Sequence, residues 1–592
     1  MSSFSKKETA LKKLILLILP LLLLVSMSQG IQENHPNGTE DCLSCPDAQP
    51  VRGCTDILVG KKASADGSVI TVHTADCGVC DWTWHHIPAA DHKPGAVRKI
   101  YHIDQVRTWP PETGGKWVKY KENDTGVEIP QVPHTYSYFH SVFGYMNEHQ
   151  LAVTESTIGC QPKMRNPTPS AVMDITTLTM LAMERCRTAR EAVKLMGSLA
   201  EQYGYGYHDS GEMLGVADAK EVWLFEIMPV GPLWTPKSGK PGAVWCAQRV
   251  PDDHVSFCPN ESRIGEIDLT LTDYYLASPN AVSLAVDMGF FDPKSGESFS
   301  WKKAYSPTEG SAADTQARRG RLWRLFDMVA PSQGFSPDVP NMDLPFSVKP
   351  DKPLSVSAVM AMTRDKYQGT EYDPARGILG GPFKNPNYFS SFQLEGESYN
   401  GPRCISVPTV EYTTLTQSRD WLPDPIGGLV WVSFGSQDTS CFIPLYAGMT
   451  RLPESFGIGD HFVFNRKSAR WAFDYVDFHT QVMYIHALED VRTEQVRWES
   501  EAIERIPHFD RLAAEIYAGD PEKALRFLTD TWVTHAESLI QAWWDLGDAL
   551  LVKYNHFRMY NPETRRTGRI VYPEEWKKAI VANEKLKPQK KR

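Results

Sequence analysis

The stretch that decides the fold begins Gly53-Cys54-Thr55-Asp56-Ile57-Leu58-Val59-Gly60 and continues through Asp66-Gly67-Ser68 into a second apolar run. An Asp-Gly pair between two strand-like runs is a strong hairpin signal. A turn centred on this pair would place Cys54 opposite residues 77–79, within a few residues of Asp76. Antiparallel partners lie about 5 Å apart. The sequence therefore predicts a thiol beside a carboxylate at the end of a hairpin.

The region before this hairpin has the pattern of a targeting segment. Four lysines precede an apolar run at residues 14–25, and Ser28-Gln29-Gly30 follow this run. A basic start, a short apolar stretch and a small-x-small site are typical of a secretory signal peptide over residues 1–30. An uncleaved anchor helix is the alternative, but the run is shorter than the ~20 residues that a membrane span needs. We expect an exported protein, periplasmic or secreted, without stable membrane insertion after signal removal.

Residues 31–53 are polar and turn-rich, which predicts a propeptide or linker. The rest has the composition of a globular protein, with 42% hydrophobic and 23% charged residues. The formal net charge of -10 disfavours nucleic acid as a partner, because phosphate contacts need a basic face.

Eleven cysteines in an exported chain favour some disulfides and, because the number is odd, one free thiol. Two close pairs, Cys42-x-x-Cys45 and Cys77-x-x-Cys80, have donor types that could hold zinc. The first pair lies in the expected leader, so disulfides or buried thiols are the favoured interpretation. We expect no cofactor and no metal.

The periodicity along the chain predicts an α+β protein. Strand patterns occur at residues 141–154, 213–226 and 409–434, and a helical pattern covers 171–201 with a capping box at Thr188-Ala189-Arg190-Glu191. After residue 466 the pattern is helical to the end, with Asp520-Pro521 opening one helix. We expect a catalytic core at 54–465 and a C-terminal helical extension at 466–592 packed on it.

Cys54 is the strongest candidate nucleophile. A free thiol with a pKa near 8.5 is only partly ionised at neutral pH. If the Gly53–Cys54 bond is cut, the new α-amine, with a reference pKa of about 7.7–8, lies on the same residue and can accept the thiol proton. This arrangement needs no histidine partner.

Residues 54–68 resemble the mature start of the cysteine dipeptidase family of N-terminal nucleophile hydrolases, which is related to secernins and to bile salt hydrolases. The resemblance extends over roughly residues 54–560. It is carried by Met146-Asn147-Glu148, residues 245–253, Asn260 with Arg263-Ile264, residues 364–373, residues 423–431 and Trp544-Asp545-Leu546-Gly547-Asp548.

The resemblance implies an αββα sandwich of two antiparallel sheets between helical layers, self-cleavage before Cys54 and amide hydrolysis on small peptide substrates. It implies that Asp76 holds the α-amine and that Asn260 helps to form the oxyanion hole. An arginine near the thiol is expected at Arg318 or Arg319. His73 stands where the family commonly has arginine. The asparagine that bile salt hydrolases have after the Asn-Glu hairpin is absent, and Glu155, Ser156 and Thr157 occupy its neighbourhood. Glu155 could pair with a substrate ammonium.

Three rival interpretations remain at this stage. One is hydrolysis of another N-acyl compound, such as a conjugated bile acid or a lactam. Another is a secernin-like protein without turnover, and the third is a binding protein in which Cys54 is bridged to Cys77 or Cys80. The sequence is also compatible with a homo-oligomer.

Overall fold

The computed structural model describes residues 53–588, apart from 79, 103–123, 166, 207–209, 307–315, 390–391 and 460. The expected signal peptide, nearly all of the expected propeptide and the pair Cys42/Cys45 lie outside the described residues. Residues 51–592 form one compact unit. Within the described part, no helix combines the length and the apolar character that crossing a membrane requires.

One antiparallel sheet contains the hairpin that carries Cys54. Its seven strands run in the order β16-β14-β1-β2-β19-β20-β21. Strand β1 lies between β14 and β2, so that a strand from residues 255–258 pairs with the one that follows the candidate nucleophile. The bounds are β1 (Thr55–Val59), β2 (Val69–Thr74), β14 (Val255–Cys258), β16 (Ser347–Val348), β19 (Tyr412–Ser418), β20 (Leu429–Phe434) and β21 (Ile443–Tyr446).

A second antiparallel sheet has eight strands in the order β15-β13-β12-β11-β10-β9-β8-β3. Most neighbours in this sheet are consecutive in the chain, as expected of hairpin connections. The bounds are β3 (His85–Ile87), β8 (Tyr138–His140), β9 (Gly144–Asn147), β10 (Ala152–Ile158), β11 (Gly211–Ala217), β12 (Val222–Met228), β13 (Val244–Arg249) and β15 (Tyr275–Ala277).

The two sheets pack against each other through β1 and β2 on one side and β10 and β11 on the other. Every residue of β1, β2, β11 and β12 is buried. The approach is close at Gly215, where an added Cβ would lie 2.3 Å from Leu58 Cδ2. Residues on the inner face of β1 therefore meet those on β11 directly, and Thr154 on β10 donates to Asp56 Oδ2 at 3.0 Å.

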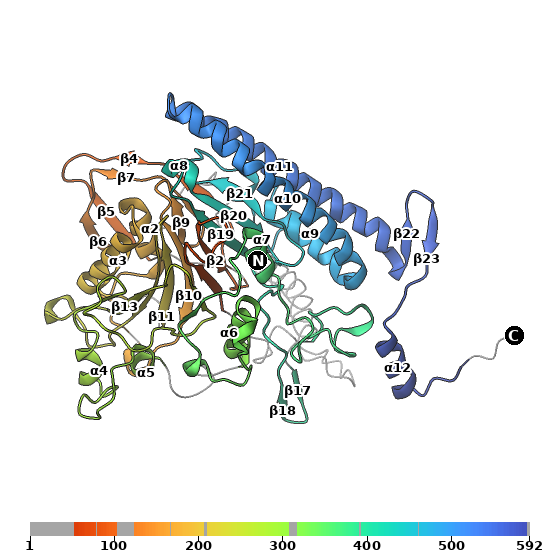
Figure 1. The fold of residues 1–592 in the computed structure, drawn as a ribbon, viewed down its shortest axis with the longest axis horizontal. Coiled ribbons are helices and arrows are strands. Elements are labelled where there is room, and N and C mark those ends of the chain that lie inside the picture. The colour runs from red at the N-terminus through yellow and green to blue at the C-terminus, as the bar shows by residue number, and fades with distance from the viewer. Residues whose placement is uncertain are drawn as a thin grey trace, which may run out of the picture. The chain divides into compact units, whose positions relative to one another are not determined.

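Helices lie against both sheets (Figure 1). Helices α2 (Ile175–Arg185) and α3 (Ala189–Tyr203) contact strands of the eight-stranded sheet, and α9 (Ala469–Val482) and α11 (Pro521–Tyr554) contact β20 and β21. The expected capping box is present, because Thr188 and Glu191 cap α3 reciprocally. Asp520 caps α11 through the N–H of Lys523. A mixed α and β protein with antiparallel sheets and C-terminal helices is therefore confirmed.

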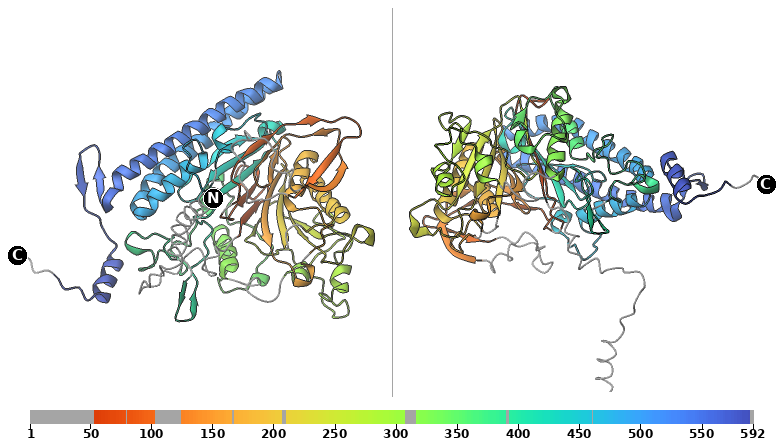
Figure 2. Two further views of the ribbon diagram at one scale, coloured as in Figure 1. Left: turned by 180° about the vertical axis from the view of Figure 1, so that it is seen from behind. Right: turned by 90° about the horizontal axis from the view of Figure 1, so that it is seen from below.

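The C-terminal helices α9, α10 (Tyr484–Tyr517) and α11 contact one another pairwise (Figure 2). The remaining elements are β4 (Ala90–Asp91), β5 (Val97–Tyr101), β6 (Asp124–Pro130), β7 (His134–Thr135), α4 (Ser283–Asp287), α5 (Trp301–Tyr305), α6 (Gln316–Val329), α7 (Val356–Met362), β17 (Phe392–Leu394), β18 (Glu397–Tyr399), α8 (Asp424–Gly427), β22 (Met559–Asn561), β23 (Arg566–Gly568) and α12 (Glu574–Asn583).

Two local expectations are wrong. The connection between β1 and β2 is not a tight turn, because residues 60–68 separate the strands and Lys62 N donates to Asp252 O at 2.7 Å. Thr55 consequently pairs with Thr74 instead of with a later residue. The C-terminal region is not helical throughout, since the hairpin β22–β23 interrupts it.

A buried ion pair joins α10 to the segment that leads into β20. Arg419 Nη1 lies 2.7 Å from Asp510 Oδ2, and both side chains are less than 10% exposed. The Tyr446 hydroxyl donates to the other carboxylate oxygen at 2.8 Å. Breaking a buried pair by removing one partner leaves an uncompensated charge.

We expect Asp510→Ala to lower the free energy of unfolding by about 3–5 kcal/mol, measured by urea denaturation. Asp530→Ala is the matched control, because the Arg451–Asp530 pair is more than half exposed and should contribute less than about 1 kcal/mol. Equal losses in the two variants would contradict the claim that the buried pair anchors the helix.

Candidate active site

The end of the β1–β2 hairpin brings Cys54 between the two sheets. Cys54 directly precedes β1, and Thr55 N donates to Thr74 Oγ1 at 2.9 Å. By continuation of the register, Gly53 lies opposite Asp76, and its N–H donates to the Asp76 carbonyl at 3.3 Å. The prediction of a thiol near a carboxylate-bearing residue at the end of the hairpin is therefore met, with a shifted register.

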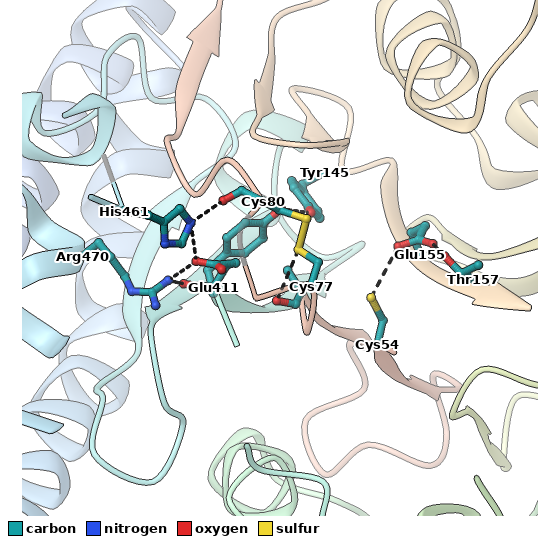
Figure 3. The surroundings of a disulfide bond; sticks show 11 residues. Cys54, Cys77, Cys80, Tyr145, Glu155, Thr157, Glu411, His461 and Arg470 are labelled. Carbon is teal, nitrogen blue, oxygen red and sulfur yellow. Dashed lines mark hydrogen bonds and ion pairs between the residues drawn. A yellow bond between two sulfur atoms is a disulfide. The ribbon is translucent and has the colours of Figure 1, made fainter. Parts of the chain in front are cut away.

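The Cys54 thiol faces a carboxylate from the opposite sheet (Figure 3). Its Sγ donates to Glu155 Oε2 at 3.6 Å, and Thr157 Oγ1 donates to Glu155 Oε1 at 3.1 Å. Burial raises the pKa of the Cys54 thiol well above its usual value, and the negative charges of Glu155 and Asp76 raise it further. Both effects disfavour the thiolate, so this thiol would need a base to act as a nucleophile.

Cys54 is a free thiol, whereas Cys77 and Cys80 are joined in a disulfide. The interpretation in which Cys54 is bridged to either of these cysteines is therefore wrong. A four-cysteine zinc site would also require Cys77 and Cys80 as thiolates, and their side chains bond to each other instead.

Asp76 is anchored by an arginine that the sequence analysis did not single out. Arg403 Nη2 donates to Asp76 Oδ2 at 2.5 Å, and Thr74 Oγ1 donates to the same oxygen at 3.0 Å. Burial raises the pKa of Asp76, and the charges of Arg403 and Arg321 oppose that rise. Within the described part of the chain Asp76 Oδ1 has no hydrogen-bond partner, which leaves one oxygen for an amine.

Asn260 lies beside the same hairpin end, in a left-handed backbone conformation with φ of 70°. Its Nδ2 donates to Ser156 Oγ at 3.2 Å and to Thr157 O at 3.0 Å. Both amide hydrogens are thus engaged in the uncut chain. To donate to an oxyanion, the Asn260 side chain has to release one of these two acceptors.

The arginine that contacts Cys54 is Arg321, and in the described part of the chain neither Arg318 nor Arg319 is hydrogen-bonded to it. Arg321 Nη1 donates to the Cys54 carbonyl at 2.8 Å, and Nη2 donates to Asn260 Oδ1 at 2.9 Å. Arg318 instead interacts electrostatically with Glu261 and Cys258. The helical phase could have found Arg321, because it shares the buried face of α6 with Leu325, four residues on.

His73 belongs to a buried polar group behind the thiol. Its Nδ1 lies 2.6 Å from the Glu155 carbonyl oxygen and 3.3 Å from Asp56 Oδ1. Burial by itself would lower the pKa of His73, but the hydrogen bond and charge of Asp56 outweigh it and raise that pKa. Burial likewise raises the pKa of Asp56 to about 7, against the lowering effect of His73. The position thus offers a proton-holding imidazole where the resemblance led us to expect arginine.

Glu212 is a further buried acid that the sequence analysis missed. It lies opposite Thr157 on β11, and its carboxyl group interacts electrostatically with that of Glu155. Burial and the charge of Glu155 raise the pKa of Glu212 well above its usual value.

Ligand atoms of Cys54, His73 and Glu155 all lie within 4.8 Å of one another, and these donor types occur in zinc sites. The Cys54 thiol and the Glu155 carboxylate hydrogen-bond to each other, and His73 bonds to the Glu155 backbone. We assign no ion to this group.

Comparison with known proteins places this site in a family. The chain matches the model of Peptidase family C69 over residues 53–497. A probable dipeptidase of Salmonella dublin is 28% identical over 410 residues, covering 67% of this chain and 82% of that protein. Dipeptidase A of Lactobacillus helveticus is 23% identical over 432 residues, covering 70% of this chain and 79% of that protein.

These matches define the class of protein as a peptidase of the cysteine type. The chain belongs to peptidase family C69, in agreement with the resemblance carried by residues 54–68.

We expect Glu155→Gln to lower the pKa of the Cys54 thiol, because it removes the negative charge that disfavours the thiolate. At a fixed pH below that pKa, iodoacetamide should then alkylate Cys54 faster, and the midpoint of the rate against pH should move to lower pH. Peptide mass spectrometry measures the alkylation at Cys54 separately from the other thiols. Glu128→Gln, at an exposed position of β6, is the control. An unchanged midpoint in Glu155→Gln would refute the assigned effect of the Glu155 charge on the Cys54 pKa.

Proposed function

We propose that this chain is an exported, self-processing dipeptidase whose nucleophile is Cys54 at a new N-terminus. The observation that carries the proposal is the Cys54 thiol, buried at the start of β1 against Glu155, inside the region that matches a peptidase family. The names of relatives from Salmonella dublin and Lactobacillus helveticus support dipeptides as the substrate class. In this proposal the two facing sheets and their flanking helices are the αββα sandwich of N-terminal nucleophile hydrolases.

The proposed organisation has a signal peptide at 1–30, a propeptide at 31–53, a catalytic core at 54–465 and a helical extension at 466–592. The Cys77–Cys80 disulfide supports export, because such bonds persist in oxidising compartments and are rare in the cytosol.

The catalytic cycle starts when the α-amine of Cys54 takes the thiol proton and the thiolate attacks the scissile carbonyl of the peptide. The free oxygen of Asp76 holds the α-amine, and Arg403 fixes Asp76 from the other side. The Asn260 side-chain amide, after releasing Ser156 or Thr157, donates to the tetrahedral oxyanion. Such a hydrogen bond is typically worth a few kcal/mol. The amine then protonates the leaving group, and water releases the acyl group from the sulfur.

The acidic pair Glu155 and Glu212 favours substrates with a free α-ammonium over N-acyl amides. In a dipeptide the ammonium is two bonds from the carbonyl under attack, and Glu155 lies 3.6 Å from the attacking sulfur. Burial and the charge of Glu155 raise the pKa of Glu212, so the pair carries less negative charge than two free carboxylates, which suits a single ammonium. Within the described chain Glu212 Oε2 has no hydrogen-bond partner. A bile acid conjugate would place an apolar acyl group against this charge.

We expect N-terminal sequencing of the mature protein to start at Cys54, and Cys54→Ala to abolish both processing and peptide hydrolysis. The reason is that one thiol performs both reactions. A mature chain that starts at Ile31 and hydrolyses peptides at the full rate would overturn the proposal and leave a non-processed enzyme or a secernin-like protein.

We expect kcat/KM for a free dipeptide to exceed that for its N-acetyl derivative and for a glycine-conjugated bile acid by about 10²-fold or more, since an unpaired buried charge costs a few kcal/mol. Glu212→Gln should narrow this ratio, mainly through KM for the dipeptide, while Cys54 remains open to alkylation. A higher kcat/KM for the N-acyl compounds would favour the amide hydrolase interpretation.

A further inference from the structure

The carbonyl group of Gly53 has an unusual environment for a peptide carbonyl that precedes a strand. It accepts a hydrogen bond from Arg403 Nη2 at 2.6 Å and a longer one from Arg321 Nη1 at 3.4 Å. The structure describes the chain with the Gly53–Cys54 bond intact, so this carbonyl belongs to the bond that self-processing would cut.

The two guanidinium groups are buried, and each has its position fixed by other partners. Arg403 also bonds to Asp76, and Arg321 also bonds to the Cys54 carbonyl, to Thr55 Oγ1 and to Asn260. Charge-assisted hydrogen bonds are roughly twice as strong as neutral ones. Two cations against the single carboxylate of Asp76 leave net positive charge at the Gly53 oxygen, which is where an oxyanion would form.

The α-carbon of Gly53 is crowded on its other side. A Cβ at this position would lie 2.2 Å from Asn260 Oδ1 and 2.8 Å from Asn260 Cγ. Asn260 cannot easily move away, because Arg321, Ser156 and Thr157 bind its side-chain amide. Only glycine fits at position 53 in this arrangement.

We propose that Arg403, assisted by Arg321, forms the oxyanion site for cleavage of the Gly53–Cys54 bond. This inference rests on the self-processing that is part of the proposed function. Asn260, by excluding a side chain at position 53, restricts the cleaved residue to glycine. Arg403 is then a catalytic residue of maturation, because it touches the reacting oxygen.

The step balances without a co-reactant other than water. The Cys54 thiol gives its proton to the Glu155 carboxylate as its sulfur bonds to the Gly53 carbon, and the carbonyl oxygen becomes the oxyanion held by Arg403. The carbon–nitrogen bond then breaks, and the nitrogen takes the proton from Glu155 to become the α-amine of Cys54. Water hydrolyses the resulting thioester, which yields the Gly53 carboxylate and restores the thiol.

The proposal is tested by pulse-chase translation of residues 31–592 in a reconstituted system, with intact-mass spectrometry of the leader-bearing and trimmed chains. Loss of one oxyanion donor typically costs 10²–10³ in rate. We expect Arg403→Gln to slow trimming by about 10²-fold. Arg403→Lys keeps the positive charge but not the planar guanidinium group, and its trimming rate should be intermediate. Gly53→Ala should slow trimming by at least tenfold, and added guanidinium ions should partly restore Arg403→Gln but not Gly53→Ala.

The Gly53→Ala variant has a built-in control. Residue 53 belongs to the leader, so the substitution is absent from any chain that has been trimmed. A chain that starts with methionine followed by Cys54, from which an aminopeptidase removes the methionine, therefore gives the mature sequence without self-processing and provides the reference peptidase activity. If the wild type is trimmed and both Arg403→Gln and Gly53→Ala are trimmed at the same rate, the inference is overturned and the proposed function remains intact. A wild-type chain that is never trimmed, yet hydrolyses dipeptides, would overturn both. If Arg403→Gln fails to fold, Arg403→Lys and Gly53→Ala still decide between these outcomes.

Discussion

The Arg321 guanidinium is the interaction on which the site depends most. One side chain from α6 binds the Cys54 carbonyl, the Thr55 hydroxyl, the Pro259 carbonyl and the Asn260 amide oxygen. It thereby ties the start of β1 to the turn after β14 and to a helix outside both sheets. Burial, together with the neighbouring charge of Arg403, lowers the pKa of Arg321 to about 9. The protein keeps this costly cation inside because its hydrogen bonds satisfy backbone and side-chain acceptors that would otherwise be unpaired.

The charges around Cys54 are divided between two sides. Asp56, Glu155 and Glu212 lie toward the eight-stranded sheet, where they disfavour a thiolate and suit a cationic ligand. Arg321 and Arg403 lie toward the backbone of residues 53–54, where they suit a developing oxyanion. A neutral thiol between these two regions is inert until a base and a carbonyl are both present.

The sequence predicts those parts of the fold that depend on local chemistry. The helices with caps at Thr188 and Asp520 begin where the sequence predicts, because capping is decided within a few residues. The hairpin register could not be predicted, since Gly60 and Lys62 bond to His254 and Asp252, far along the chain. Arg403 gave no signal either, because it lies in a loop and meets Gly53 across 350 residues. Arg321 was missed for a different reason. The resemblance pointed to the arginines at 318 and 319, and only the helical periodicity shows that Arg321 is the one on the buried face of α6.

The Cys77–Cys80 disulfide immediately follows Asp76, so the polypeptide carries two sulfur centres with opposite redox requirements close to one site. Cys54 has to remain a thiol to act as a nucleophile, whereas the neighbouring pair is oxidised in the folded chain. A reductant that protects Cys54 from oxidation also attacks the disulfide next to Asp76, the residue proposed to hold the α-amine. The proposed mechanism therefore needs a redox potential at which Cys54 stays reduced while the Cys77–Cys80 bond in the loop after β2 stays oxidised.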